Sequence, residues 1–206
     1  MVANDVGNDA MTGNSASALG AEIAGCTHCA AHLPHGPRPV VQIGAGARLL
    51  IIGQAPGARV HESGVPWDDD SGDRLREWTG LGRADFYAAD KVALMPMGFC
   101  YPGKGANADL PPRPECAPLW HARVRAALPA VRLTLLVGIH AQDHYLADRR
   151  TLTERVRDWA SAGPALFPLP HPSWRSTGWM KRNPWFEAEV LPALRHAVAG
   201  VMLQGL

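Results

Sequence analysis

Four predicted strands alternate with segments in which apolar residues recur at helical spacing. The strands cover residues 47–53, 86–95, 132–138 and 165–169, and the runs at 47–53 and 132–138 are short, apolar and bounded by glycine or turn residues, as is typical of buried parallel strands. The segments with helical spacing cover residues 74–81, 114–128, 141–146, 151–159 and 184–198. This alternation predicts an α/β fold with three layers, αβα, around a central, mostly parallel four-stranded sheet.

Three loops follow the predicted strands and are expected to carry the functional residues. They cover residues 54–73, 97–116 and 170–184. Ligands of open α/β sheets bind outside the carboxyl ends of the strands, where these loops meet. Neither a dinucleotide-binding nor a P-loop fingerprint is present, because Gly44-Ala-Gly46 precedes its strand and residues 53–57 lack the Gly-Lys-Ser/Thr ending.

The chain is expected to form a single domain over residues 21–206. Residues 1–20 are rich in Ala, Asn, Gly and Ser without periodicity, which predicts a disordered leader. No apolar run reaches the roughly 18 to 20 residues of a membrane span, and the first residues do not resemble a signal peptide. We therefore expect a cytoplasmic monomer that makes no membrane contact.

The overall charge is close to neutral, with 20 Lys and Arg against 19 Asp and Glu. This balance excludes a histone-like, wholly electrostatic binder of nucleic acid. Residues 159–186, however, contain no acidic side chain and carry Arg175, Lys181 and Arg182 among four tryptophans. Basic side chains beside aromatic ones suit contacts with phosphates and with stacked bases.

Four cysteines point to a metal site. Cys26 and Cys29 form a C-x2-C pair, while Cys100 and Cys116 follow far downstream. Without an export signal the thiols are expected to stay reduced, so disulfides are not the first expectation. The spacing leaves three alternatives open: an iron-sulfur cluster, a zinc ion, or unligated buried cysteines.

Two motifs at strand ends resemble the signature motifs of the uracil-DNA glycosylase superfamily. They are Gly53-Gln-Ala-Pro-Gly57 and His171-Pro-Ser173. Together with Gly64-Val-Pro66-Trp67 and the four cysteines, the pattern resembles the iron-sulfur branch, family 4. The resemblance implies a DNA glycosylase that flips a deaminated base, most often uracil, out of the duplex and hydrolyses its N-glycosidic bond. It also implies a structural 4Fe-4S cluster on Cys26, Cys29, Cys100 and Cys116, with zinc as the alternative.

The resemblance assigns roles to individual residues. Trp67 would stack on the base, and His171 would donate a hydrogen bond to the departing base oxygen. The alternatives are a core tryptophan and a structural histidine. In the first motif, the residues that would contact the base are Gly53, Ala55 and Gly57. In and after the second motif, the residues that would contact DNA are Ser173, Trp174, Arg175, Lys181 and Arg182.

The first motif departs from the family at its catalytic positions. The carboxylate that positions or activates water in this superfamily is replaced by Gln54 and Ala55, neither of which can act as a general base. We take Gln54 as a ligand of the base or of water. The missing general base could be one of the three aspartates at positions 68–70, with Asp68 as the candidate, or it could be His61. A short acidic run is equally typical of a solvated turn.

A second departure concerns base specificity. Pro96 stands where the iron-sulfur branch has an asparagine, four residues before the third cysteine, and Asn107 is the nearest substitute. We therefore expect relaxed specificity for uracil, hypoxanthine or xanthine. No lysine lies near the two motifs as a Schiff-base nucleophile, which predicts a monofunctional hydrolase. The loss of both carboxylates leaves two alternatives, a catalytically weak protein that binds damaged or single-stranded DNA and an enzyme that acts on a free nucleoside or nucleotide.

Overall fold

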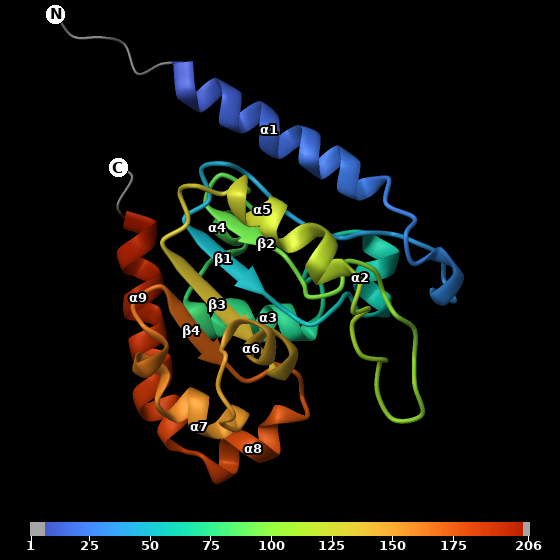
Figure 1. Ribbon diagram of the computed structural model, residues 1–206. Coiled ribbons are helices and arrows are strands. Elements are labelled where there is room, and N and C mark those ends of the chain that lie inside the picture. The colour runs from blue at the N-terminus through green and yellow to red at the C-terminus, as the bar shows by residue number, and fades with distance from the viewer. Residues whose placement is uncertain (1–6, 204–206) are drawn as a thin grey trace, which may run out of the picture.

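The computed structural model describes residues 7–203, with side chains from residue 16 onward. Its centre is a four-stranded parallel sheet in the order β2-β1-β3-β4 (Figure 1). The strands are β1 (Leu49–Ile52), β2 (Val92–Leu94), β3 (Leu133–Val137) and β4 (Leu166–Leu169). The predicted three-layer α/β fold is therefore confirmed.

Alternate residues of each strand point to opposite faces of the sheet and build two cores. In β1, Leu50 and Ile52 join one core, while Leu49 and Ile51 join the other. All four side chains are buried, which explains why the sequence of β1 is continuously apolar. Each such side chain stabilises the fold by about 1.5–3 kcal/mol when it is buried.

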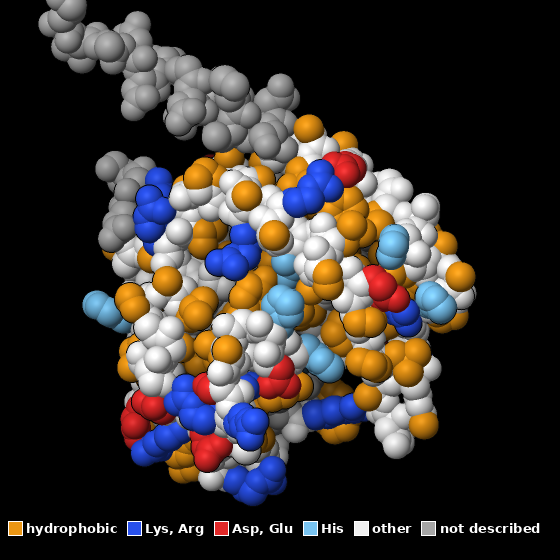
Figure 2. All heavy atoms as spheres, viewed as in Figure 1, with side chains coloured by type: hydrophobic (Ala, Val, Ile, Leu, Met, Phe, Trp, Pro, Cys, Tyr) orange, Lys and Arg blue, Asp and Glu red, His pale blue; other side chains and the backbone are white. Residues whose placement is uncertain are grey.

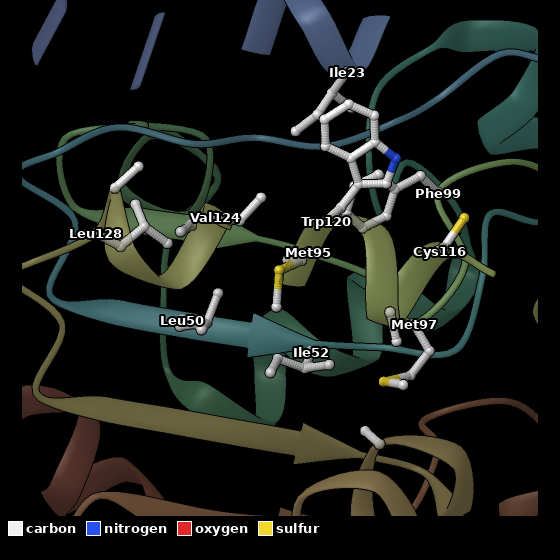
Figure 3. Packing of buried hydrophobic residues seen from close by; sticks show 14 of the residues in the cluster. Ile23, Leu50, Ile52, Met95, Met97, Phe99, Cys116, Trp120, Val124 and Leu128 are labelled. Carbon is white, nitrogen blue, oxygen red and sulfur yellow. The ribbon is translucent and has the colours of Figure 1, made fainter. Parts of the chain in front are cut away.

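Helices cover both faces of the sheet. The first layer contains α1 (Gly7–Ala24), η2 (Ala117–His121), α5 (Ala122–Ala126) and α6 (Ile139–Tyr145). Figure 3 shows Ile23 of α1 and Val124 of α5 on the side of the sheet to which Leu50 and Ile52 point. The second layer contains α3 (Asp70–Thr79), α4 (Arg83–Phe86), α7 (Leu152–Arg157), η4 (Phe186–Val190) and α9 (Leu191–Leu203).

Short helical turns complete the chain between these elements. They are η1 (Ala30–His32), α2 (Ala58–Ser63), η3 (Trp159–Ala162) and α8 (Ser176–Arg182). Among residues 7–203, no helix combines the length and the apolar character that crossing a bilayer requires.

The expectation of a disordered leader does not hold for residues 7–20, which lie in α1. Ala16, Leu19 and Ile23 recur at helical spacing, and their buried side chains join the first core. The layer that covers this face therefore begins before residue 21, where we had placed the start of the domain. Residues 1–6 lie outside the described part of the chain.

The second strand is shorter than predicted. Phe86 ends α4, and the amides of Lys91 and Val92 donate to the Ala88 carbonyl in a turn, so the strand begins only at Val92. Phe86 nevertheless packs in the second core. The residues before Val92 therefore form helix and turn rather than strand, and among residues 86–91 only Phe86 is buried.

Charged side chains gather around α7 (Figure 2). Arg155 is only 2% exposed and donates to Asp143 at 2.6 Å and to Asp148 at 2.8 Å. Arg150 also pairs with Asp148 at 2.9 Å. A buried arginine needs such partners, because an unpaired buried charge is strongly destabilising. These pairs fix the connection between β3 and β4.

Candidate active site

A cavity of about 450 Å³ lies where the loops after β1, β2 and β4 meet. Its place at the carboxyl ends of the strands is the one expected for a parallel sheet. The residues that the sequence predicted and that line this cavity are Gly53, Gln54, Ala55, Gly57, Trp67, Asn107, His171, Ser173, Trp174 and Arg175. Segments up to about 120 residues apart in the chain thus form one site.

Trp67 forms one wall of the cavity and packs tightly on the first motif. A Cβ atom at Gly53 would lie 2.6 Å from Cζ2 of Trp67, so the indole can occupy this place only because residue 53 is glycine. The ring centre of Trp67 lies 5.8 Å from that of His171. Trp67 is partly buried and also contacts the second core, so it combines a core contact with a place in the cavity.

The backbone of Trp67 is held in a conformation that few residues adopt. Its φ angle is +58°, and among residues 7–203 it is the only non-glycine residue with positive φ. Its carbonyl oxygen accepts hydrogen bonds from Tyr87 Oη at 3.1 Å and from Arg76 Nη1 at 3.4 Å. Gly72 also lies so close to this carbonyl that a Cβ atom there would clash with it. Such strain persists only where surrounding contacts enforce it, as they do here.

His171 is placed in the cavity as a neutral imidazole. Burial lowers its pKa to about 4, so the ring carries no charge near neutral pH. Its carbonyl oxygen accepts a hydrogen bond from Ser176 Oγ at the start of α8, which fixes the backbone of the second motif. A neutral imidazole can still donate one N–H to an oxygen in the cavity.

Of the three aspartates after Trp67, the structure places Asp69 in the cavity rather than Asp68. Asp68 points away and pairs with Arg83 at 3.0 Å. Asp69 is the N-cap of α3: its Oδ1 accepts from the amide of Gly72 at 2.8 Å. Its Oδ2 lies 4.0 Å from the place a Cβ atom would take on Gly57. Burial raises the pKa of this carboxyl group.

His61 does not reach the cavity. It lies on α2, where its ring packs 5.9 Å from that of Tyr101 and 6.0 Å from that of His35. The short helix that follows the first motif turns this side chain away from the cavity. His61 therefore does not join the residues of the cavity, and the geometry gives no support to it as a general base.

The loop after β2 contributes a small hairpin over residues 103–110. Lys104 pairs with Asp109 as antiparallel neighbours, and the amide of Gly105 donates to the Ala108 carbonyl at 2.7 Å. Lys104 and Asp109 both line the cavity, and the sequence alone had not singled them out. The only sequence signal was a glycine-rich loop, which does not show where its polar side chains point.

The basic residues near the second motif fall into two groups. Arg175 donates to the backbone carbonyl of Asn107 and so ties the loop after β4 to the 103–110 hairpin. Trp174 is 75% exposed at the edge of the cavity. Lys181 and Arg182 are exposed on α8 but do not line the cavity. Trp179 and Trp185 pack against the second core rather than the cavity.

A family model of the uracil DNA glycosylase superfamily matches residues 41–195, which is most of the chain. The chain belongs to the uracil DNA glycosylase superfamily. This membership confirms the resemblance drawn from the first and second motifs. The match covers both motifs, all four strands and the cavity between them.

The first motif brings no carboxylate into the cavity. Gln54 and Ala55 line the cavity without an ionisable group. Two carboxylates instead approach the first motif from other loops. Oδ2 of Asp109 lies 3.6 Å, and Oδ2 of Asp69 lies 4.0 Å, from the place that a Cβ atom would take on Gly57. Pro96 also lines the cavity, so the wall that carries an asparagine in the iron-sulfur branch is apolar here.

The four cysteines surround one second, small cavity, together with apolar residues and Arg113. Cys26 is half-buried, whereas Cys29, Cys100 and Cys116 are buried. Burial raises the pKa of the Cys100 and Cys116 thiols to about 11. Among the described residues, no group of three or more His, Cys, Asp or Glu side chains is close enough to hold one metal ion. The four thiols thus line one common space but do not converge closely enough to bind a single ion.

Proposed function

We propose that this protein is a DNA glycosylase that removes a deaminated base, most often uracil, by hydrolysis of its N-glycosidic bond and leaves an abasic site. The observation that carries this proposal is the cavity that brings together the first motif, Trp67, Asp69 and His171. Membership of the superfamily supports the reaction class. A base cannot be attacked inside a duplex, and a cavity of this size accommodates one extruded nucleotide.

The first motif and Trp67 would bind the extruded base. The indole of Trp67 offers a flat apolar face beside the His171 ring, and stacking on an aromatic ring contributes about 1–3 kcal/mol per base. The side-chain amide of Gln54 can donate to and accept from the polar edge of a pyrimidine. Ala55 and Gly57 also line the cavity, and their backbone amides would be further donors to the base.

His171 and Asp69 would act at the two ends of the bond that breaks. Cleavage builds negative charge on the departing base and positive charge on the sugar. His171, neutral and buried, would donate its N–H to the base oxygen on which the charge develops. The carboxylate of Asp69 would activate or position the attacking water and stabilise the cationic sugar. Its raised pKa brings it closer to the working pH, which favours a general base.

The exposed residues beyond the cavity would hold the DNA. Trp174 is suited to fill the gap left by the extruded base, and Arg175, Lys181 and Arg182 are suited to contact phosphates. Arg175 also supports the 103–110 hairpin, so it would join DNA contact to the shape of the cavity.

Excision assays on oligonucleotides test the proposal directly. Duplex and single-stranded oligonucleotides with one uracil, hypoxanthine or xanthine are incubated with the protein and then treated with alkali. Strand breaks at the modified position are expected on at least the uracil substrate. DNA binding without a strand break on any substrate would overturn the proposal of an enzyme and would favour a protein that only binds damaged DNA. Base release from free deoxynucleosides but not from DNA would favour the nucleoside enzyme.

The same assay without alkali tests whether the enzyme is monofunctional. Lys104 lines the cavity, so the premise that no lysine lies near the site is wrong for the folded chain. We still propose simple hydrolysis, because Asp69 supplies a carboxylate for water. A covalent adduct between protein and DNA after borohydride reduction, lost in Lys104→Ala, would instead show a Schiff base.

We propose that the four cysteines hold a structural 4Fe-4S cluster. A cubane takes one sulfur per iron, and thiols placed around one space suit it better than they suit a single zinc ion. When bound, the cluster would tie the segment of Cys26 and Cys29 to the loop between Cys100 and Cys116, next to the 103–110 hairpin.

Iron content and colour test the cluster. Protein purified without oxygen is expected to be brown, with absorbance near about 400 nm and about four irons per chain. Replacement of any one of the four cysteines by serine should lower the iron content and the melting temperature together. A colourless wild-type protein with one zinc per chain would show that the alternative metal is correct.

A further inference from the structure

A buried histidine lies outside the cavity and joins two parts of the protein. His121 is 3% exposed and ends η2, the π-helical turn that starts directly after Cys116. π-Helical turns are rare and often occur near functional sites, because they re-aim side chains. None of the roles proposed above uses His121.

Both ring nitrogens of His121 have a partner, and these partners fix its tautomer. Nε2 lies 3.2 Å from the carbonyl oxygen of Pro96, and Nδ1 lies 2.7 Å from Tyr145 Oη. A carbonyl can only accept, so Nε2 carries the hydrogen and Nδ1 accepts from the tyrosine hydroxyl. Burial lowers the pKa of His121 to about 4, which is consistent with this neutral form.

The residue that His121 holds belongs to the wall of the cavity. Pro96 lines the cavity, and the next two amides bond to the first motif: Met97 N donates to Gly53 O at 2.9 Å, and Gly98 N donates to Gln54 O at 3.0 Å. Pro96 has no N–H of its own and cannot join this ladder as a donor. The hydrogen bond from His121 therefore holds the carbonyl side of the Pro96–Met97 peptide, whose amide side already bonds to Gly53.

Packing around the ring leaves it little freedom. The ring stacks on Phe99, with centroids 5.8 Å apart and planes 13° apart, and on Tyr145 at 6.0 Å. His144 touches its edge at 5.8 Å, and this side chain is exposed on α6. Figure 2 shows histidine side chains at the surface between α5 and α6. His144 is thus a neighbour of similar chemistry that does not bond to Pro96.

We propose that His121 is a positioning residue for the base-binding wall, which it holds through the Pro96 carbonyl, and that it links this wall to the turn that begins at Cys116. The inference rests on the proposed function for its catalytic consequence. The claim that His121 holds residues 96–98 in place does not depend on which reaction the protein catalyses.

The decisive comparison is between two substitutions of His121. His121→Phe keeps the stack on Phe99 but cannot donate, whereas His121→Gln keeps an N–H that can reach the carbonyl. In single-turnover excision, His121→Phe should raise the half-saturating enzyme concentration about tenfold, with a smaller change in the maximal rate. His121→Gln should stay within about threefold of wild type. His144→Gln, the matched control, should be unchanged.

Amide hydrogen exchange separates this inference from the proposed reaction. His121→Phe should speed exchange at Met97 and Gly98, while His121→Gln should leave it near the wild-type rate. If wild type excises no base but this exchange pattern holds, the reaction is wrong and the positioning role is correct. Equal exchange rates and equal half-saturation in all three proteins would overturn the role.

Tyr145→Phe provides a second variant in case His121→Phe does not fold. Loss of the tyrosine hydroxyl frees the ring to change tautomer, so the half-saturating concentration should rise by about threefold. In the His121→Gln background the same substitution should have no further effect, because no Nδ1 remains. Additive effects of the two substitutions would contradict the proposed chain of hydrogen bonds.

Discussion

Replacement of His171 by alanine is expected to slow base excision about 100-fold, the scale found when one oxyanion donor is removed. The side chain is buried in the cavity and neutral, so its N–H is available to the departing base without a prior loss of a proton. The measurement is the maximal rate of single-turnover excision on a uracil oligonucleotide. The half-saturating enzyme concentration should change much less, because the bond to the base oxygen strengthens only as the charge develops.

Two controls make the His171 result specific. His196→Ala removes an exposed histidine of α9 that does not line the cavity, and it should leave the maximal rate within about threefold of wild type. The pH profile gives the second control, because a pKa of about 4 keeps the wild-type ring neutral from pH 5 to pH 8. The ratio of wild-type to His171→Ala rates should thus be constant over this range. An unchanged maximal rate in His171→Ala would remove this residue from the mechanism.

The fold could be predicted from the sequence because its strands are buried on both faces. The apolar runs at 132–138 and 165–169 became β3 and β4 with shifts of only one residue at their ends. α1 was missed because its sequence is rich in small and polar residues, and only its contact with the first core shows which face is buried. Tertiary packing, rather than local pattern, decides such a segment.

The motifs that form the site could be predicted from the sequence, but the directions in which individual side chains point could not. Asp68 and Asp69 are neighbours in the sequence, yet one pairs with Arg83 and the other lines the cavity. The left-handed backbone of Trp67 and the N-cap of α3 together decide this direction. Neither can be read from a run of three aspartates.

Other parts of the site depend on contacts between distant segments. Lys104 and Asp109 reach the cavity from the 103–110 hairpin, which Arg175 ties to the loop after β4. His121 supports the wall through a carbonyl 25 residues away in the chain. None of these three residues stands in a motif, and their places follow from the packing of η2 and of the loop after β4.

Asp69→Asn is expected to reduce the maximal excision rate by at least about 100-fold, in line with the loss of a general base. The substitution is well suited to this question, because asparagine caps a helix about as well as aspartate and can keep the bond to the Gly72 amide. Burial raises the pKa of Asp69, so its ionised form is disfavoured in the folded state. Asp69→Asn should therefore leave the melting temperature at neutral pH unchanged or slightly higher.

The pH profile and two comparison variants decide whether the carboxylate itself is needed. A base must be ionised, so the wild-type rate should fall as the pH drops through the raised pKa of Asp69, and this acid limb should be absent in Asp69→Asn. Asp68→Asn loses only the pair with Arg83 and should keep the wild-type rate. Asp109→Asn tests the other carboxylate that faces Gly57. If Asp109→Asn rather than Asp69→Asn slows excision about 100-fold and removes the acid limb, the water is activated from the 103–110 hairpin and Asp69 serves only as the cap of α3.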